Sequence, residues 1–347
     1  MNAAAGWFEC DTRFIPGHFQ PGMLIDLALG RGLNSHRLLR GTGLFYEDIV
    51  AGTARLSPQQ WLALIGNVRT LPAGEDIGFL LGQRSLPGHF GAASHAFAQA
   101  AHLHDALDVL IEQRAQLSPL LTPRLEVDDN RLQLHWLDAY GCGEQYRFVL
   151  EASMAAVASA TRWLSGERLP WRFEFRQAQP RHIEQYWVHL GDALRFERPR
   201  DSMVLPREWL HRPWPGASTI AAQGARLESQ RQLAEQRLHS SLLDQLHDYL
   251  LAHIRDPLNL ERVATAFGLS PATLKRRLQK HGTHFQEQLD LARLHVALHL
   301  YEARGYSNDA VAAYLRFNDT TNFRRSFKRW TGQSPSALRQ LLGWAPG

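Results

Sequence analysis

The sequence predicts an α+β N-terminal domain followed by an all-α C-terminal domain that contains two helix-turn-helix units. Apolar residues alternate over 124–137 and 171–177, as in half-buried strands, whereas most other segments have helical periodicity. A helix–turn–helix pattern also occurs twice, at 260–282 and 309–332, with an offset of 48–49 residues. These observations place the strands in the first two thirds of the chain and the repeat in the last third.

Charge is distributed unevenly along the 347 residues. From Asp256 to Gly347 there are 13 Lys/Arg against 7 Asp/Glu, a net charge of +6. The remaining 255 residues hold 25 basic and 27 acidic side chains, a net charge of −2. A basic domain attached to a near-neutral one predicts a polyanionic partner for the C-terminal domain.

The composition excludes several classes of protein. The chain is 44% hydrophobic and 21% charged, which is typical of a soluble globular protein of two or three domains. It has no apolar run of about 18 residues and no signal-peptide pattern, so we expect no membrane segment. Two cysteines, Cys10 and Cys142, are too few for a disulfide scaffold and fit a reducing cytoplasm.

The N-terminal domain is expected to begin with helices and to continue with strands. Ser57 can cap a helix over 57–65, with Pro58 in its first turn. The turn residues at 128–130 predict a hairpin between the two alternating segments at 124–137. The expected elements, in order, are short helices over 22–66, a helix over 92–116, the hairpin, a buried helix over 145–164, and strands over 171–177 and 194–206.

A polar helical segment connects the two domains. Its leucines, Leu227, Leu233, Leu238 and Leu242, lie among Gln, Arg and Glu. This pattern fits a linker helix, a dimer-forming helix or an ordinary core stripe. The predicted boundaries are 1–217 for the first domain, 218–244 for the linker helix and 245–347 for the C-terminal domain.

The two copies of the repeat share their apolar positions and their turn chemistry. Val263 and Ala264 in the first copy correspond to Val311 and Ala312 in the second. In the first copy Gly268 can adopt the left-handed conformation that ends a helix, and the following Ser-Pro pair can cap and begin the next helix. Each copy therefore predicts a helix-turn-helix, whose second helix enters the major groove of DNA.

The second helix of each unit presents basic and polar side chains opposite its apolar face. Arginine pairs with guanine and asparagine with adenine, so Arg276, Arg325 and Asn322 are the predicted base contacts. Lysine and arginine also bind phosphates, which we assign to Lys275, Lys280, Arg324 and Lys328. A pair of solvated amphipathic helices is the alternative, but a basic second helix in both copies favours DNA. The full set of predicted DNA-binding residues is Ala272, Lys275, Arg276, Lys280, Thr321, Asn322, Arg324, Arg325 and Lys328.

The segment between the units predicts a long helix over 285–303. Phe285, Leu289 and Ala292 begin an apolar stripe along it. Nineteen helical residues span about 28 Å, and successive major grooves on one face of DNA lie about 34 Å apart. One monomer is thus expected to read two successive grooves, with some bending of the DNA.

At these residues the sequence resembles the AraC/XylS family of transcriptional regulators. The resemblance rests on GLSPATLKRRLQKHGTHFQEQLDLARLHVA at 268–297 and on LRFNDTTNFRRSFKRWTGQSPSALR at 315–339. Arg316 stands where the family usually has glycine, so a left-handed turn there would cost on the order of 1 kcal/mol. This difference predicts that the first unit reads DNA with more base specificity than the second.

The N-terminal domain resembles the arabinose-binding-type effector domain of one branch of this family. The similarity rests on PGHFG at 87–91 and on residues 182–217. It implies a domain that senses a small molecule, and the ligands of related regulators include small metabolites and fatty acids. We expect the same domain to mediate dimerisation. The residues of this effector site remain unassigned by the sequence.

The sequence as a whole predicts a DNA-binding regulator that responds to a ligand and acts as an activator. The expected partners are double-stranded promoter DNA, a small-molecule effector, RNA polymerase and a second copy of the chain, in a bacterial cytoplasm and on the nucleoid when bound. One alternative is a constitutive DNA-binding regulator without a ligand. Another is an enzyme with an accessory helical domain, which is disfavoured because no HExxH, GxSxG, GxGxxG or P-loop motif and no cofactor motif occurs. We therefore expect no catalytic residue and no cofactor.

The N-terminal domain contains a group of histidines and a group of aromatic residues that are candidates for a metal site and an effector site. His95, His102 and His104 are close in sequence, but positions 102 and 104 point in different directions on a helix, so no metal site is predicted. A set of aromatic residues fits either the core or the lining of an apolar pocket, to which His135 or Arg147 would add polarity. These aromatic residues are Phe90, Trp136, Tyr146, Trp163, Trp171 and Phe173.

Overall fold

The computed structural model describes residues 6–71, 74–235 and 240–343. They form two compact units, which meet in the chain between Ser241 and Leu242. The N-terminal unit combines helices with a sheet, and the described part of the C-terminal unit contains helices and loops alone. The predicted fold class, α+β followed by all-α, is confirmed.

Helices dominate the first half of the N-terminal unit. The predicted helix after Ser57 is present, and its first turn is closed by a capping box in which the Ser57 hydroxyl accepts from the Gln60 amide at 3.2 Å. The elements up to the main sheet are β1 (Ile15–Pro16), α1 (Gln20–Gly30), α2 (Ser35–Leu38), α3 (Tyr46–Val50), β2 (Arg55–Leu56), α4 (Pro58–Thr70), α5 (Ile77–Ser85), α6 (Ala92–Ala98), α7 (Leu103–Glu112) and α8 (Arg114–Leu117).

The single helix predicted over 92–116 is wrong, because three helices cover this segment. α6 ends before Gln99, and His102 then starts α7 as an extended N-cap whose ring accepts from the Asp105 amide at 3.3 Å. The Asp105 carboxylate in turn accepts from the Ala101 amide at 3.3 Å. These caps satisfy amides that a continuous helix would have bonded internally. The apolar periodicity continues across the break, which is why the sequence predicts a single helix.

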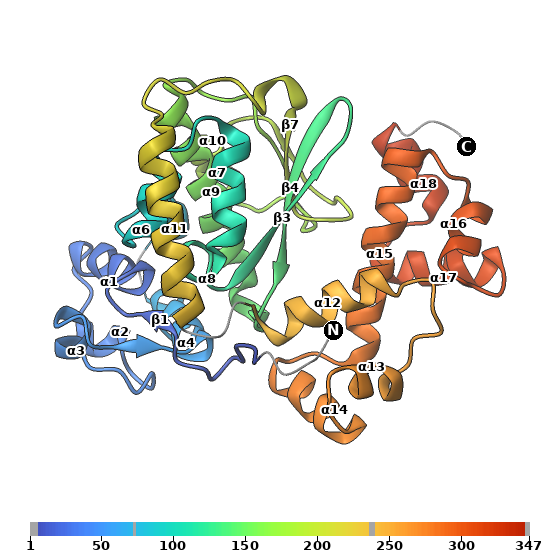
Figure 1. Ribbon diagram of the computed structural model, residues 1–347, viewed down its shortest axis with the longest axis horizontal. Coiled ribbons are helices and arrows are strands. Elements are labelled where there is room, and N and C mark those ends of the chain that lie inside the picture. The colour runs from blue at the N-terminus through green and yellow to red at the C-terminus, as the bar shows by residue number, and fades with distance from the viewer. Residues whose placement is uncertain (1–5, 72–73, 236–239, 344–347) are drawn as a thin grey trace. The chain divides into compact units, whose positions relative to one another are not determined.

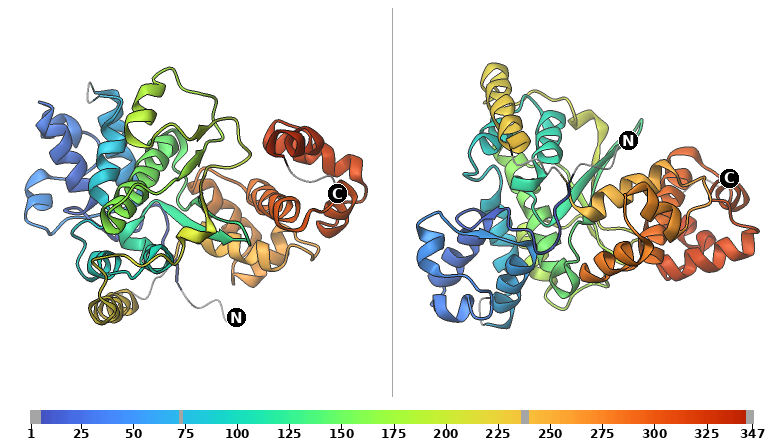
Figure 2. Two further views of the ribbon diagram at one scale, coloured as in Figure 1. Left: turned by 90° about the horizontal axis from the view of Figure 1, so that it is seen from above. Right: turned by 60° about the horizontal axis from the view of Figure 1, so that its bottom comes forward.

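Five strands form a mixed sheet in the order β3-β4-β7-β5-β6. The predicted hairpin is confirmed, with Leu125 opposite Leu134, and the Asp128 carboxylate holds its turn by accepting from the amides of Asn130 and Arg131, both at 2.9 Å. Helices α7 and α9 both pack against strand β3 of the sheet, as Figures 1 and 2 show. The elements of this part are β3 (Leu121–Val127), β4 (Arg131–Asp138), α9 (Tyr146–Ser165), β5 (Arg172–Glu174), α10 (Ile183–His189), β6 (Leu194–Arg195) and β7 (Ser202–Pro206).

Helices α5 and α9 pack closely against each other. At Gly82 a side-chain Cβ would lie 2.2 Å from the Ala152 carbonyl oxygen and 2.8 Å from the Ala155 Cβ. Glycine is therefore required for the backbones to approach this closely. The contact fixes α9 beside α5, and these two helices form part of the wall of the apolar pocket described below.

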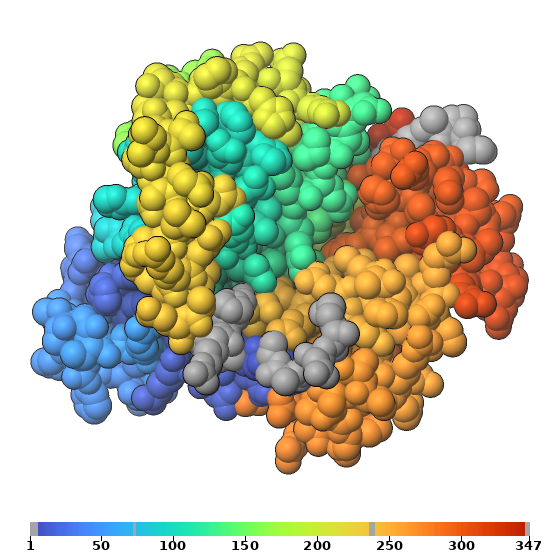
Figure 3. Space-filling model, in the orientation of Figure 1, coloured from blue at the N-terminus to red at the C-terminus, as the bar shows by residue number. Residues whose placement is uncertain are grey.

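The predicted linker helix is α11 (Thr219–Glu235), and it packs against α6 within the N-terminal unit. Its Arg226 forms a bidentate ion pair with Glu112 of α7, with the shorter N–O distance 2.5 Å. In Figure 3 it lies as a yellow strip on the surface of this unit. Leu233 is buried but Leu227 is 47% exposed, and Leu238 lies outside the described residues. The described leucines therefore do not form a continuous stripe.

The C-terminal unit contains the two predicted helix-turn-helix units around a long helix. Figure 1 shows α13 and α14 at one end of α15, with α16 and α17 toward the other. None of the described helices is both long and apolar enough to cross a membrane. The helices of the C-terminal unit are α12 (Leu242–Ala252), α13 (Leu260–Ala266), α14 (Pro271–Lys280), α15 (Phe285–Arg304), α16 (Asn308–Tyr314), α17 (Thr320–Thr331) and α18 (Pro335–Leu342).

Candidate nucleic-acid interface

The turn of the first helix-turn-helix unit has the predicted geometry. Gly268 has φ +67°, and the Leu269 amide then donates back to the Ala264 carbonyl at 2.9 Å. The Ser270 hydroxyl caps α14 by accepting from the Thr273 amide at 3.1 Å. The left-handed residue and the serine cap together end α13 and redirect the chain into α14.

The turn of the second unit repeats this geometry with an arginine. Arg316 has φ +58°, and the Phe317 amide donates to the Ala312 carbonyl at 2.9 Å, as in the first turn. A residue with a Cβ in this conformation costs about 1–2 kcal/mol. The Arg316 guanidinium also donates to the Arg255 carbonyl at 2.9 Å, which offsets part of that cost. The substitution therefore leaves the hydrogen-bonded geometry of the turn unchanged.

Each second helix is anchored by apolar side chains with no exposed surface. Leu274 and Leu278 hold α14, and Phe323 and Phe327 hold α17. In α17 the aromatic packing extends to Tyr301 of α15, whose ring centre is 5.8 Å from that of Phe327. Helix α15 is thus part of the core beneath the second unit.

An ion pair also ties α17 to α15. The Arg329 guanidinium donates to the Asp290 carboxylate at 2.8 Å, and Asp290 itself is largely buried. One turn along α15, Arg293 lies over the ring of Phe317, 5.2 Å from its centre. Burial lowers the pKa of the Arg293 guanidinium, and the nearby Asp290 charge partly opposes this shift. Arg329 and Arg293, neither of which is among the predicted DNA-binding residues, therefore contribute to packing within the second helix-turn-helix unit.

All nine predicted DNA-binding side chains are exposed on α14 and α17. The guanidinium groups of Arg276 and Arg325 have no hydrogen-bond or ion-pair partner among the described residues. Charged groups that are exposed and unpaired remain available to nucleic acid. α14 and α17 are ten and twelve residues long, and α15 with its 20 residues spans about 30 Å between the two units.

Asn322 differs from the other predicted base contacts because its side chain already has a partner. Asp319 caps α17 by accepting from the Asn322 amide at 2.7 Å, and its second carboxylate oxygen accepts from the Asn322 side-chain amide, also at 2.7 Å. Recognition of adenine by Asn322 would require this second bond to break. Asp319 therefore both caps α17 and holds the side chain of Asn322.

The aromatic residues considered for an effector site have different environments. Trp136 lines an apolar pocket, whereas Trp171 is core and donates its ring N–H to Thr161 at 3.2 Å. Trp163 is 64% exposed, so its assignment to a core or a pocket lining is wrong. Phe90 and Phe173 are fully buried, and Tyr146 donates to Asp201 at 3.2 Å. The polar candidates His135 and Arg147 face carboxylates, with His135 at 3.5 Å from Glu126 and Arg147 at 2.8 Å from Glu151.

Two exposed basic helices, each the second helix of a capped helix-turn-helix, define a DNA-binding protein. Comparison with known proteins agrees with this class. Residues 32–214 match the model of the arabinose-binding domain of AraC transcription regulators, and residues 263–341 match a helix-turn-helix domain model. The chain belongs to the AraC family of transcription regulators and is a DNA-binding regulator of that family.

Several relatives match most of the chain. The ornithine utilization regulator of Pseudomonas aeruginosa is 29% identical over 318 residues, which cover 91% of this chain and 94% of the relative. The transcriptional regulator VirS of Mycobacterium tuberculosis is 25% identical over 296 residues, 82% of this chain and 86% of VirS. Among solved structures, the transcriptional regulator CdpR from Pseudomonas aeruginosa aligns with a TM-score of 0.43 and 21% identity, over 93% of this chain and 98% of CdpR.

Proposed function

We propose that the C-terminal unit reads two successive major grooves, with α14 in one groove and α17 in the next. The observation that carries this proposal is the pair of exposed basic helices separated by one rigid helix of about 30 Å. This length is close to the separation of about 34 Å between grooves on one face of DNA, and modest bending supplies the difference. Base contacts come from Arg276, Arg325 and Asn322, and phosphate contacts from Lys275, Lys280, Arg324 and Lys328.

The spacing of the two half-sites tests the two-groove proposal. Inserting 5 base pairs between them turns one half-site to the opposite face of the DNA, and α15 prevents α14 and α17 from following. We expect the footprint of the full-length protein to shrink to one half-site and its affinity to fall by at least tenfold. Inserting 10 base pairs restores the face but not the distance, so it is also expected to weaken binding. Equal affinity for all three spacings would contradict reading by a rigid pair of helices.

We further propose that the N-terminal unit binds an uncharged, mainly apolar effector and that this ligand makes the protein an activator. The supporting observation is a half-open, apolar pocket of about 60 Å³ in which no charged side chain lies among the described lining residues. The lining residues are Gln20, Trp61, Ile65, Leu81, Ser85, Leu86, Leu110, Leu117, Ser118, Pro119, Leu120, Leu121, Trp136, Phe148, Val149, Ala152, Ser153, Ala156 and Val157.

One polar group in this pocket specifies the chemistry of the ligand. The buried Gln20 side chain donates its amide N–H to the Gln116 carbonyl at 2.6 Å, which fixes the orientation of the amide. Its Oε1 atom has no hydrogen-bond partner among the described residues. An unsatisfied buried acceptor is costly, and a ligand hydroxyl or amide N–H would satisfy it. A carboxylate or a zwitterionic amino acid finds no counter-charge here.

Ligand-induced thermal stabilisation, with 1-octanol and octanoate as matched probes, tests the effector proposal. A ligand at 100 times its Kd stabilises the native state by about 2.7 kcal/mol. We expect 1-octanol to raise the Tm of the full-length protein and octanoate to raise it much less. Ser153→Trp, which fills the pocket from α9, is expected to abolish the response, and Ser153→Ala to retain it. A Tm shift of the same size in both variants would place the ligand elsewhere. No Tm shift with either probe would favour a constitutive regulator.

Regulation by this ligand requires that its binding to the N-terminal unit changes DNA binding by the C-terminal unit. α11 packs on α6 and pairs with α7 through Arg226 and Glu112, and it precedes the DNA-binding unit in the chain. A ligand that binds two arrangements of these helices with different affinity shifts their populations and so changes DNA binding. Contact of the activated protein with RNA polymerase and dimerisation through the N-terminal unit complete this proposal.

A further inference from the structure

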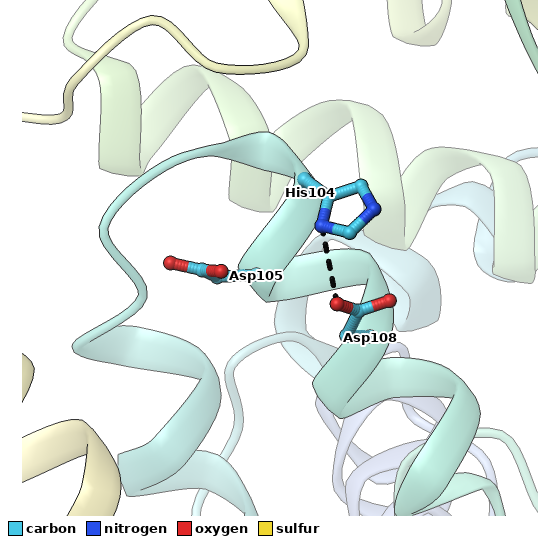
Figure 4. Close-up of side chains that lie close together, drawn as sticks. All are labelled: His104, Asp105 and Asp108. Carbon is cyan, nitrogen blue, oxygen red and sulfur yellow. Dashed lines mark ion pairs between the residues drawn. The ribbon is translucent and has the colours of Figure 1, made fainter. Parts of the chain in front are cut away.

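Three histidines and two aspartates meet at the start of α7. His104 and Asp108 face each other one turn apart, with the His104 Nδ1 atom 3.1 Å from the carboxylate. One ligand atom each of His104, Asp105 and Asp108 lies within 4.8 Å of the others. Figure 4 shows these three side chains on the first turns of the helix.

Two further imidazoles complete the cluster, and one of them comes from a distant segment. The ring of His211 lies 5.3 Å from that of His104 and 4.9 Å from that of His102, measured between centres. His102 and His104 would point in different directions if both lay within a helix. His102 is instead the extended N-cap residue with φ −163°, so its ring points back toward His104, 6.2 Å away.

From this arrangement we propose that His104, Asp105, Asp108 and His211 bind a divalent transition-metal ion, with Zn²⁺ as the best match. Zn²⁺ takes four nitrogen and oxygen ligands in a tetrahedron, and imidazole with carboxylate is a donor set that suits it. Two imidazoles on one such ion have ring centres about 5 Å apart, which matches the His104–His211 separation.

The donor atoms of the three α7 residues need little movement to bind the ion, whereas His211 lies outside that group and would reach the ion by rotation of its exposed side chain. Donor atoms on one tetrahedral Zn²⁺ lie about 3.4 Å apart, compared with the 4.8 Å limit found for the three residues of α7. Their side chains are partly exposed, at 37% for His104 and 36% for Asp108, so rotation closes the gap without disturbing the core. His102 keeps its Nδ1 atom on the Asp105 amide and supports the site from beside it.

The ion would join two segments that already contact each other through their backbones. The His104 amide donates to the Leu210 carbonyl at 3.0 Å, and the Trp214 amide donates to the Ala101 carbonyl at 2.9 Å. Residues 210–218 lead directly into α11. Metal binding would therefore fasten the segment before α11 to the start of α7, independently of the apolar pocket.

Calorimetric titration of the metal-free full-length protein with ZnCl₂ tests this site. We expect one Zn²⁺ per chain at micromolar or tighter affinity, no comparable binding of Mg²⁺, and a higher Tm with Zn²⁺. Loss of an outer-shell partner typically lowers metal affinity by 10- to 100-fold, so loss of a direct ligand should lower it by at least about tenfold. His104→Gln and His211→Gln are each expected to weaken Zn²⁺ binding by at least tenfold, and His36→Gln, at an exposed histidine of α2, to leave it unchanged.

The same variants separate loss of the site from loss of the fold. Without metal, each variant is expected to keep the Tm of the wild-type protein, because its side chain is at the surface. Co²⁺ gives an independent readout, since its visible absorption reports a four-coordinate site and should disappear in His211→Gln. The proposal is overturned if the wild-type protein binds no Zn²⁺ at micromolar concentration. It is also overturned if His104→Gln and His211→Gln bind Zn²⁺ like the wild type, which would assign binding to others of the 17 histidines.

Discussion

Replacement of Phe327 by alanine is expected to destabilise the second helix-turn-helix unit by about 3–5 kcal/mol. Phe327 has no exposed surface and packs between three aromatic rings, with centres 5.8 Å from Tyr301, 5.7 Å from Phe323 and 6.3 Å from Trp330. The cavity left by alanine removes contacts to all three, and they cannot collapse together without moving α17 against α15. Because α17 is the proposed reading helix, binding at its half-site should also fail.

Native-state hydrogen exchange of the full-length protein measures this effect locally. The amides of α17 are expected to exchange faster by a factor that corresponds to the lost free energy, whereas those of α4 in the N-terminal unit should not change. Phe327→Leu is the matched control and should lose far less protection. A loss below about 1 kcal/mol for Phe327→Ala would mean that aromatic packing does not hold α17 in place.

Replacement of Arg276 by alanine is expected to cost about 1–3 kcal/mol on specific DNA and to relax the preference for one base pair. The Arg276 side chain is exposed on α14 and its guanidinium has no intramolecular partner among the described residues, so the loss reports on DNA and not on stability. Binding to random DNA should change much less. The measurement is a competition assay at fixed salt against a library randomised at each position of the site.

Lys275→Ala provides the contrasting control on the same helix. A lost phosphate contact weakens specific and random DNA alike and lowers the salt dependence by about one unit. The sequence predicts a smaller loss for Arg325→Ala than for Arg276→Ala, although the turn at Arg316 keeps the same backbone hydrogen bond as the turn at Gly268. Equal losses from Arg276→Ala and Arg325→Ala would contradict that ranking, and an equal loss on specific and random DNA would contradict a base contact.

Much of the DNA-binding unit was predictable because its determinants are local in sequence. Gly268 and Ser270 encode the first turn and its cap, and the apolar spacing of Phe323 and Phe327 fixes which face of α17 is buried. The predicted hairpin is local in the same way. Such features depend on residues that are close together in the sequence, where conformational preferences and periodicity suffice.

Features that depend on distant or side-chain contacts were not predictable in this way. Periodicity does not reveal the break between α6 and α7, because the apolar stripe continues while His102 and Asp105 cap the new helix. His211 joins His104 from 107 positions along the chain, and no spacing rule connects them. The hydrogen bond from the Asn322 side chain to Asp319 depends on a side-chain rotamer, which the sequence does not specify.

Arg316 has an evolutionary consequence beyond its own turn. Its guanidinium binds the carbonyl of Arg255, and the guanidinium of Arg255 lies over the ring of Tyr314, 5.1 Å from its centre. The loop before α13 and the end of α16 therefore stabilise each other through two contacts, one donated by each segment. A mutation in one will have an effect that depends on the residue in the other, which is epistasis between the two helix-turn-helix units. Replacement of Arg316 by glycine would relieve the backbone and at the same time remove the hydrogen bond that ties this loop to the turn.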